Sequence, residues 1–320
     1  MAKILVTGAT GAVGRFVARS LLAEGHTLRL LLRSPNTPFS NTRVTVHQAD
    51  LGQPHTLKGA CEGMDIVIHL AAMLHVNNPS AELHHQYRQV NVVGTQRLVE
   101  DALRHQVRRF VFASTISVYG SSNGRPAFTE HAPLQANSIY AETKIKSEHY
   151  VRNKIDHVIL RLAAVYGQQM NGNYPRMVRA IGKRRFAYVG DGHNRRAIIH
   201  ERDVAAGFSH AIHAADALNQ TFNLTDGQEH TLREISEAIA AAQNVKPPSI
   251  HLPVKPLRLA LGFAETAFNT IRVKTPLSPM LVDKMMEDVA VSNQKFQTLC
   301  GFTPQVNLTQ GWVDACQTSA

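Results

Sequence analysis

Short apolar runs alternate with longer amphipathic segments along the first half of the chain. The runs are almost wholly apolar, which is typical of parallel strands covered by helices on both faces. This alternation predicts an α/β fold with a doubly wound parallel (Rossmann) sheet. We expect strands at residues 3–7, 28–32, 44–48, 65–70, 109–114 and 157–161, and helices at 14–24, 57–61, 84–105 and 139–153.

A glycine pattern follows the first predicted strand directly. Residues 7–14 read Thr-Gly-Ala-Thr-Gly-Ala-Val-Gly, so Gly8, Thr10, Gly11 and Gly14 lie where the strand leads into a helix. Glycines at such a turn let backbone N–H groups approach a pyrophosphate at the helix N-terminus. Close packing alone would also require glycine. The position after an N-terminal strand favours a dinucleotide site.

The pattern changes after residue 167. Residues 168–196 are rich in Asn, Gly and Arg, and a Pro-rich link follows a predicted helix at 232–243. We therefore expect two parts. The first is a dinucleotide-binding Rossmann domain of residues 1–167 and 200–225. The second is a smaller, discontinuous substrate-binding lobe of residues 168–199 and 226–320.

The carboxyl ends of the strands are where such a sheet binds ligands. The second strand ends at Arg33, where an acid that accepts from the ribose hydroxyls of NAD is usual. A guanidinium suits the 2′-phosphate of NADP, so we expect NADP, with NAD as the alternative. Asp50 and Leu51 follow the third strand, and Asp50 either binds the adenine amino group or only forms a turn. Ala71 and Ala72 follow the fourth strand and are further candidates for cofactor contact.

Tyr140 and Lys144 are four residues apart and share one helical face. A free phenol has a pKa of about 10, so it needs a neighbouring positive charge to release its proton at neutral pH. Lys144 can supply that charge and can also hold the nicotinamide ribose. Thr115, after the fifth strand, can bond a substrate oxygen beside Tyr140, and Ser114 and Ser117 compete for this role. The pattern indicates acid–base chemistry beside a hydride carrier.

The composition of the chain indicates which kinds of ligand and partner to expect. The 320 residues carry a net charge of +10, which favours anionic small molecules such as nucleotides. Lys and Arg are spread along the chain with no basic tail or aromatic–basic motif, so nucleic acid is not expected. The three cysteines show no metal spacing and fit a reducing cytoplasm, and the 17 histidines form no metal pattern, so no metal is expected. We also expect a homodimer.

A membrane-inserted protein is not expected. No apolar stretch approaches the ~20 residues needed to span a bilayer. The first strand begins by residue 3, so a signal peptide is not expected either. Residues 257–268 are apolar and helix-like. We expect a packed helix or a lid over the substrate there, with a membrane-surface helix as the lesser alternative.

Seven motifs, in order along the first 170 residues, resemble those of extended short-chain dehydrogenases/reductases of the NAD(P)-dependent epimerase/dehydratase type. They are TGATGAVG at 7–14, DL at 50–51, HLAA at 69–72, NVVGT at 91–95, FASTISVYG at 112–120, YAETK at 140–144 and RLAAVYG at 161–167. The resemblance implies that Thr115, Tyr140 and Lys144 are the catalytic residues. It also implies that Asn91 lies on the helix supporting Lys144, acting through its backbone or a water.

Two later segments resemble substrate-binding segments of nucleotide-sugar members. They are residues 172–174, which include Asn173, and residues 194–200. Arg196 falls where a related arginine grips the substrate pyrophosphate. Taken by themselves, Arg195 and Arg196 are two cations in a loop, which suits an anion site and a solvated loop equally.

Three functions remain open at this stage. The first is an oxidoreductase or epimerase acting on a nucleotide-sugar. The second is an NADP-dependent reductase of a steroid- or flavonoid-like ketone, whose apolar pocket residues 257–268 could supply. The third is a cofactor sensor without turnover, although such proteins usually lose the Tyr or the Lys. Arg33 and the short substrate lobe argue against a tightly held NAD and a standard hexose epimerase.

Overall fold

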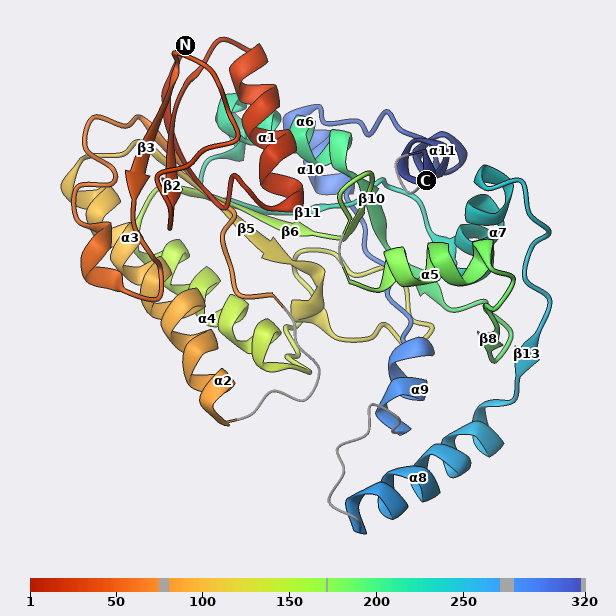
Figure 1. The fold of residues 1–320 in the computed structure, drawn as a ribbon. Coiled ribbons are helices and arrows are strands. Elements are labelled where there is room, and N and C mark those ends of the chain that lie inside the picture. The colour runs from red at the N-terminus through yellow and green to blue at the C-terminus, as the bar shows by residue number, and fades with distance from the viewer. Residues whose placement is uncertain (75–80, 171, 271–278, 318–320) are drawn as a thin grey trace.

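The computed structural model of the chain describes residues 1–74, 81–170, 172–270 and 279–317. Its centre is a parallel seven-stranded sheet with strand order β11-β6-β5-β4-β1-β2-β3 (Figure 1). Strand order reverses between β1 and β4, the point at which open α/β sheets bind ligands. This confirms the predicted fold class. The strands are β1 (Lys3–Thr7), β2 (Thr27–Leu32), β3 (Val44–Gln48), β4 (Ile66–His69), β5 (Arg109–Thr115), β6 (His157–Leu162) and β11 (Gln220–Leu224).

Helices cover both faces of this sheet (Figure 1). On one face α1 (Ala12–Ala23) packs against α6 (Glu201–His213), and on the other α3 (Gly94–Arg104) packs against α4 (Ile139–Lys154). Alternate residues of a strand point to opposite faces. Ile4 therefore joins the apolar core under α1 and α6, while Leu5 joins the core under α3 and α4. Two buried faces explain the unbroken apolar runs in the sequence.

The predicted helices at 84–105 and 57–61 differ in the structure. The first is three consecutive segments, α2 (Ala81–Tyr87), a π-helical turn η2 (Arg88–Val93) and α3. The second prediction was wrong. A short 3₁₀ helix, η1 (Pro54–Leu57), lies earlier because Pro54 favours a helix start, and Gly59 follows with φ +78°.

Smaller elements complete the chain. Three short two-stranded pairs are β7 (Ala164–Tyr166) with β10 (Ile198–His200), β9 (Arg195–Arg196) with β12 (His230–Thr231), and β8 (Tyr188–Val189) with β13 (His251–Leu252). The helices α5 (Asn173–Gly182), α7 (Leu232–Ala242) and α11 (Leu308–Cys316) share a core around Trp312. Short 3₁₀ segments are η3 (Ile116–Tyr119) and η4 (Ala215–Ala217).

The proposed division into two domains stays a prediction. One part of residues 226–320 packs directly on the central sheet. Phe296 of α10 (Gln294–Cys300) stacks on Phe222 of β11 with ring centroids 4.7 Å apart. The residues assigned to the smaller lobe therefore include a helix that belongs to the core of the sheet.

Helices α8 (Val254–Thr270) and α9 (Pro279–Met285) contact each other and project from the body of the molecule (Figure 1). The apolar helix predicted at 257–268 lies within α8. Two of its largest side chains, Leu259 and Phe263, are 65% and 74% exposed, so the expectation of a packed helix was wrong for that face. No helix in the described part of the chain is long and apolar enough to cross a membrane.

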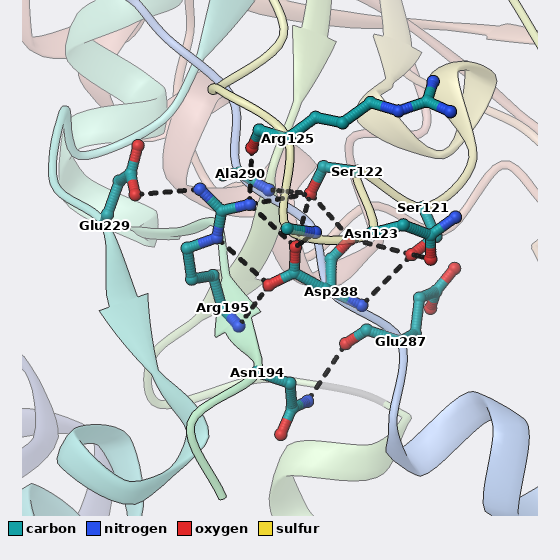
Figure 2. Close-up of polar contacts among 11 residues, drawn as sticks. Ser121, Ser122, Asn123, Arg125, Asn194, Arg195, Glu229, Glu287, Asp288 and Ala290 are labelled. Carbon is teal, nitrogen blue, oxygen red and sulfur yellow. Dashed lines mark hydrogen bonds and ion pairs between the residues drawn. The ribbon is translucent and has the colours of Figure 1, made fainter.

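Residues 287–291 tie the region around β9 to the loop after β5 (Figure 2). Arg195 donates to Asp288 from its backbone N–H at 2.7 Å, from Nε at 3.1 Å and from Nη2 at 2.7 Å. Ser122 adds a hydrogen bond at 2.9 Å. Burial alone would raise the pKa of Asp288, but the bonds from Arg195, Gly124 and Ser122 hold it well below its usual range. Arg195 therefore has a structural partner within the chain.

Candidate active site

A cavity of about 1290 Å³ runs along the carboxyl ends of the parallel strands, from β3 to β6. Its size exceeds that of a typical small-ligand pocket and suits a dinucleotide with a second ligand. Thirteen residues singled out in the sequence line it, namely Gly8, Thr10, Gly11, Gly14, Arg33, Asp50, Leu51, Ala71, Ala72, Ser114, Thr115, Tyr140 and Lys144. Asn91, Asn173 and Arg196 are not among the described residues that line it.

The glycine turn has the close approaches that its pattern predicts. Gly8 has φ +75°, and the Gly11 N–H donates to the Gly8 carbonyl at 3.0 Å. A Cβ atom on Gly14 would lie 2.0 Å from that same carbonyl oxygen, so no side chain fits there. Gly11 caps α1, whose N-terminus therefore opens on the cavity with backbone N–H donors for an anion.

Asp50 and Arg33 line the cavity near β3 and β2. The Asp50 Oδ1 accepts the Gly52 N–H at 2.8 Å, so this carboxylate forms a turn as well as facing the cavity. Arg33 has an exposed side chain, and its backbone carbonyl accepts from Gln48 at 3.1 Å. A guanidinium at the cavity rim can reach a bound anion.

Helix α4 carries Tyr140 and Lys144 into the cavity wall. Its first turn is fixed by Ser138, whose Oγ accepts the Ala141 N–H at 3.2 Å. The Thr115 side chain lies near the Tyr140 phenol, and both line the cavity. Burial raises the pKa of Tyr140 to about 12, the neighbouring Tyr87 adds to this, and Thr115 opposes it. The phenol therefore holds its proton at neutral pH until a positive charge comes close.

Lys144 lies one turn further along α4 and is 3% exposed. Its Nζ is 4.3 Å from the centre of the Phe112 ring, a cation–π contact. Burial lowers the pKa of Lys144 to about 7, and the charge of Glu148 opposes this shift. A lysine with a pKa near neutrality responds to small electrostatic changes at the site.

The neighbouring serines have different partners. Ser114 donates to Glu148 at 2.5 Å, so its hydroxyl is engaged by the chain itself. The Thr115 hydroxyl donates to the Ser117 Oγ at 3.1 Å. Among the three hydroxyls considered in the sequence, Thr115 is the one that affects the pKa of Tyr140.

Asn91, in the π-helical turn η2, holds the segment after β4, which lines the cavity, through hydrogen bonds. Its Oδ1 accepts the Met73 N–H at 2.7 Å and its Nδ2 donates to the Met73 carbonyl at 3.1 Å. Nδ2 also reaches Thr143, the residue before Lys144, at 3.1 Å. The Asn91 carbonyl accepts from two hydroxyls at 2.6 and 2.7 Å, which occupies both lone pairs. The Asn91 carbonyl thus has partners other than Lys144, and its side chain reaches Thr143, while a link to Lys144 through a water stays a prediction.

His69, at the end of β4, joins this network as a neutral ring. Thr95 gives its hydroxyl proton to the Asn91 carbonyl, so it accepts from His69 Nε2–H at 2.9 Å. Nδ1 then accepts from Thr7 at 2.7 Å, and the Thr7 oxygen accepts the Ala71 N–H at 3.1 Å. Burial, aided by the charge of Lys144, lowers the pKa of His69 to about 3.

Arg196 and Asn173 lie away from the cavity wall. The Arg196 Nη2 donates to the carbonyls of Lys284 at 3.1 Å and Met285 at 2.9 Å, and Nη1 is 3.7 Å from Glu287. Asn173 begins α5 and is exposed. Tyr174 follows Asn173 in α5. Burial raises the pKa of Tyr174 to about 12, and the charge of Arg196 opposes this shift. The charge of Arg196 therefore acts on the first turn of α5, where Asn173 lies.

Several cavity residues escaped the sequence analysis. His85, Gln86 and Gln89 face the cavity from α2 and the turn that follows it. Glu201, at the start of α6, lines the cavity with Asp50 as the other acid. Glu201 carried little signal in the sequence, because it follows β10, a short strand that pairs with β7 and lies outside the central sheet.

One cluster of metal-binding residue types lies elsewhere. Ligand atoms of Glu24, His26 and His213 all lie within 4.8 Å of one another. His26 Nδ1 accepts the backbone N–H of Ala2 at 3.1 Å, so the ring hydrogen is on Nε2, the atom that faces Glu24. While the Ala2 N–H donates to Nδ1, the hydrogen on Nε2 prevents that atom from coordinating a metal.

Comparison with known proteins identifies the family. The model of the NAD dependent epimerase/dehydratase family matches residues 4–225. A farnesylated-quinoline ketoreductase, 4-hydroxy-2-methyl-3-oxo-4-farnesyl-3,4-dihydroquinoline-1-oxide ketoreductase of Stigmatella aurantiaca, is 26% identical over 322 residues, covering 97% of this chain and 94% of that protein. The dTDP-glucose 4,6-dehydratase of an Actinoplanes species is 29% identical over 270 residues, covering 75% and 81%. The solved structure of gox2253 superposes with a TM-score of 0.82 at 25% identity, covering 99% and 98%. The chain therefore belongs to the NAD dependent epimerase/dehydratase family of enzymes, as its motifs indicated.

Proposed function

We propose that the enzyme transfers a hydride between NADP and a carbinol or ketone carbon of a nucleotide-sugar. The observation that carries the reaction is that Tyr140, Lys144 one helical turn further along α4, and Thr115 at the end of β5 line the wall of one cavity of about 1290 Å³. The glycine turn and the N-terminus of α1 supply backbone donors for the cofactor pyrophosphate. When bound, the nicotinamide supplies the hydride chemistry.

Tyr140 is the general acid or base in this proposal. Its phenol donates a proton to the substrate oxygen when a ketone is reduced, and its phenolate accepts the proton when an alcohol is oxidised. Thr115 orients the substrate oxygen through its hydroxyl. The Lys144 ammonium favours the phenolate in the oxidative direction. Asn91 and His69 position the strand end and α4, so they support the site without touching the reacting atoms.

Three features support a nucleotide-sugar as the substrate. The net charge of +10 favours an anionic ligand. Arg196 and the start of α5 lie together and offer a guanidinium and backbone donors. The related dehydratase carries a nucleotide-sugar, dTDP-glucose, in its name.

A second candidate is the reduction of a hydrophobic, non-sugar ketone. Arg196 favours it, because this guanidinium already binds two carbonyls and faces Glu287, so a pyrophosphate would have to compete for it. The farnesylated-quinoline ketoreductase, related over 97% of this chain, is named for a reaction of this kind. The homodimer and the cytoplasmic location stay predictions.

Calorimetric titration of UDP, UDP-glucose and dTDP-glucose separates the two candidates. We expect wild-type protein to bind them, and Arg196→Ala to weaken binding about ten- to a hundredfold, because a charge-assisted hydrogen bond is worth roughly 1.5–3 kcal/mol. Arg176→Ala, an exposed arginine on the same α5, is the matched control and should change little. If wild-type protein binds none of these at millimolar concentration, the nucleotide-sugar proposal fails and a panel of hydrophobic ketones is the next test.

A further inference from the structure

Glu201 is a buried acid at one end of the cavity. It is the first residue of α6, directly after β10, and only 3% of it is exposed. Among the described residues of the cavity wall the other acid is Asp50, which follows β3. Asp50 follows β3, which lies at one edge of the sheet. Glu201 lies against Gly167, in the segment that follows β6 and β7, so the two carboxylates lie at opposite ends of the cleft.

The Glu201 side chain is held in one conformation. One carboxylate oxygen, Oε1, accepts the backbone N–H of Gln168 at 2.8 Å, and the Gln169 backbone N–H lies close enough to lower the pKa of the carboxyl group. The side chain lies directly against Gly167, where a Cβ would be 2.2 Å from Glu201 Cδ. A side chain fixed by the backbone in this way is preorganised for a ligand.

The charge of Glu201 has no cationic partner at ion-pair distance in the part of the chain that the structure describes. Burial raises its pKa, and the backbone N–H groups of Gln168 and Gln169 and the charge of Arg202 oppose this. A carboxylate has about four acceptor positions, so positions remain for a donor from the cavity. A phosphate would be repelled there, whereas a neutral N–H donor would be attracted.

We propose that Glu201 accepts a hydrogen bond from the carboxamide NH₂ of the nicotinamide ring. This inference rests on the proposed function, because it requires a dinucleotide in the cleft. Adenosine groups have partners near β2 and β3, where Arg33 and Asp50 lie, and the pyrophosphate has donors at the glycine turn. The nicotinamide end then falls among Thr115, Tyr140 and the residues after β6, and Glu201 lines that same end with Val165 and Tyr166.

An analogue that lacks the donor tests this contact. In 3-acetylpyridine adenine dinucleotide phosphate a methyl group replaces the carboxamide NH₂ of NADP⁺. Wild-type protein should bind NADP⁺ about tenfold or more tightly than the analogue, as expected for one charge-assisted hydrogen bond. Glu201→Leu should bring the two affinities to within about twofold. Glu201→Gln retains an acceptor for Gln168 and should give an intermediate ratio.

Asp50→Asn is the matched control, because it removes the other acid of the cleft without touching the nicotinamide end. It should leave the ratio of the two affinities unchanged, whatever its effect on each. If Glu201→Gln and Glu201→Leu both keep the wild-type ratio, the proposed contact is overturned while the cofactor site stands. If wild-type protein binds neither NAD⁺ nor NADP⁺, the proposed function itself is overturned. Should Glu201→Leu fail to fold, the ratio measured on Glu201→Gln decides.

Discussion

Glu148 and Arg161 form a bidentate ion pair beneath the strand that ends at Thr115. Arg161 donates from Nε to Oε1 at 3.0 Å and from Nη2 to Oε2 at 2.7 Å. Both residues are buried, and Ser114 donates to the same carboxylate. The pair therefore joins β5, β6 and α4, the three elements that position the candidate catalytic residues.

Removing Arg161 should leave the buried Glu148 carboxylate with the exposed Arg152, at 3.4 Å, as its remaining ion-pair partner among the described residues. We expect Arg161→Met to lower the free energy of unfolding by about 3–5 kcal/mol, measured by urea denaturation. Replacing both partners, as Glu148→Leu with Arg161→Met, should recover much of this loss. Arg97→Ala, which breaks an exposed pair with Glu100, is the control. An Arg161→Met protein no less stable than this control would show that the pair contributes little.

The buried histidines make stability depend on pH in a defined direction. Burial lowers the pKa of His69 to about 3 and that of His200 to about 4. In the unfolded chain both have a pKa of about 6.5, so between pH 6.5 and about 4 the unfolded state binds protons that the folded state does not. The free energy of unfolding should therefore fall as pH decreases through this window, by up to about 1.4 kcal/mol per pH unit for each histidine.

Urea unfolding at pH 7, 6 and 5 measures this slope. His200→Phe should reduce it, because the variant removes one titrating group whatever its absolute stability. An unchanged slope in this variant would assign the pH dependence to other groups.

The contact between Arg195 and Asp288 predicts a local effect. Asp288→Asn removes the charge that accepts from Arg195, Gly124 and Ser122, so residues 279–291 should open more often. Limited proteolysis should cut this segment at least several times faster than in wild-type protein. Asp283→Asn, which breaks an exposed pair with Arg258, serves as the comparison. Equal cleavage rates in the two variants would contradict the role of Asp288.

Sequence reasoning succeeded where the signal is local. The glycine turn and the spacing of Tyr140 and Lys144 depend on backbone geometry over a few residues, and the apolar runs follow from burial on both faces. It failed where partners lie far apart in the chain. Arg196 contacts a carbonyl 88 positions later, so its partners could not be read from a two-residue motif.

The same limit explains Glu201 and the exposed face of α8. The acceptor role of Glu201 depends on backbone N–H groups 33 positions earlier, which only the pairing of β7 with β10 brings close. For α8, the apolar pattern indicates a buried face, but the fold places α9 as its main contact and leaves Leu259 and Phe263 exposed.

Arg33 predicts the choice of cofactor. The exposed guanidinium at the end of β2 lines the cavity, where it can bind a 2′-phosphate. Calorimetry should show tighter binding of NADP⁺ than of NAD⁺ by wild-type protein, and Arg33→Asp should reverse this preference. Arg15→Ala, another arginine near the glycine turn, is the control, since its Nε bonds to the Thr10 carbonyl. Tighter NAD⁺ binding by wild-type protein would contradict this role.

The central claim is that the Tyr140 phenol carries the proton during hydride transfer. The most direct measurement compares turnover and dinucleotide affinity for wild-type protein and Tyr140→Phe, with the substrate identified by the titrations above. General acid–base groups contribute about 10²–10⁴-fold, so we predict a loss of turnover of that size with a dinucleotide dissociation constant within about twofold of wild type. A Tyr140→Phe protein that keeps more than about half of the wild-type turnover would contradict the account.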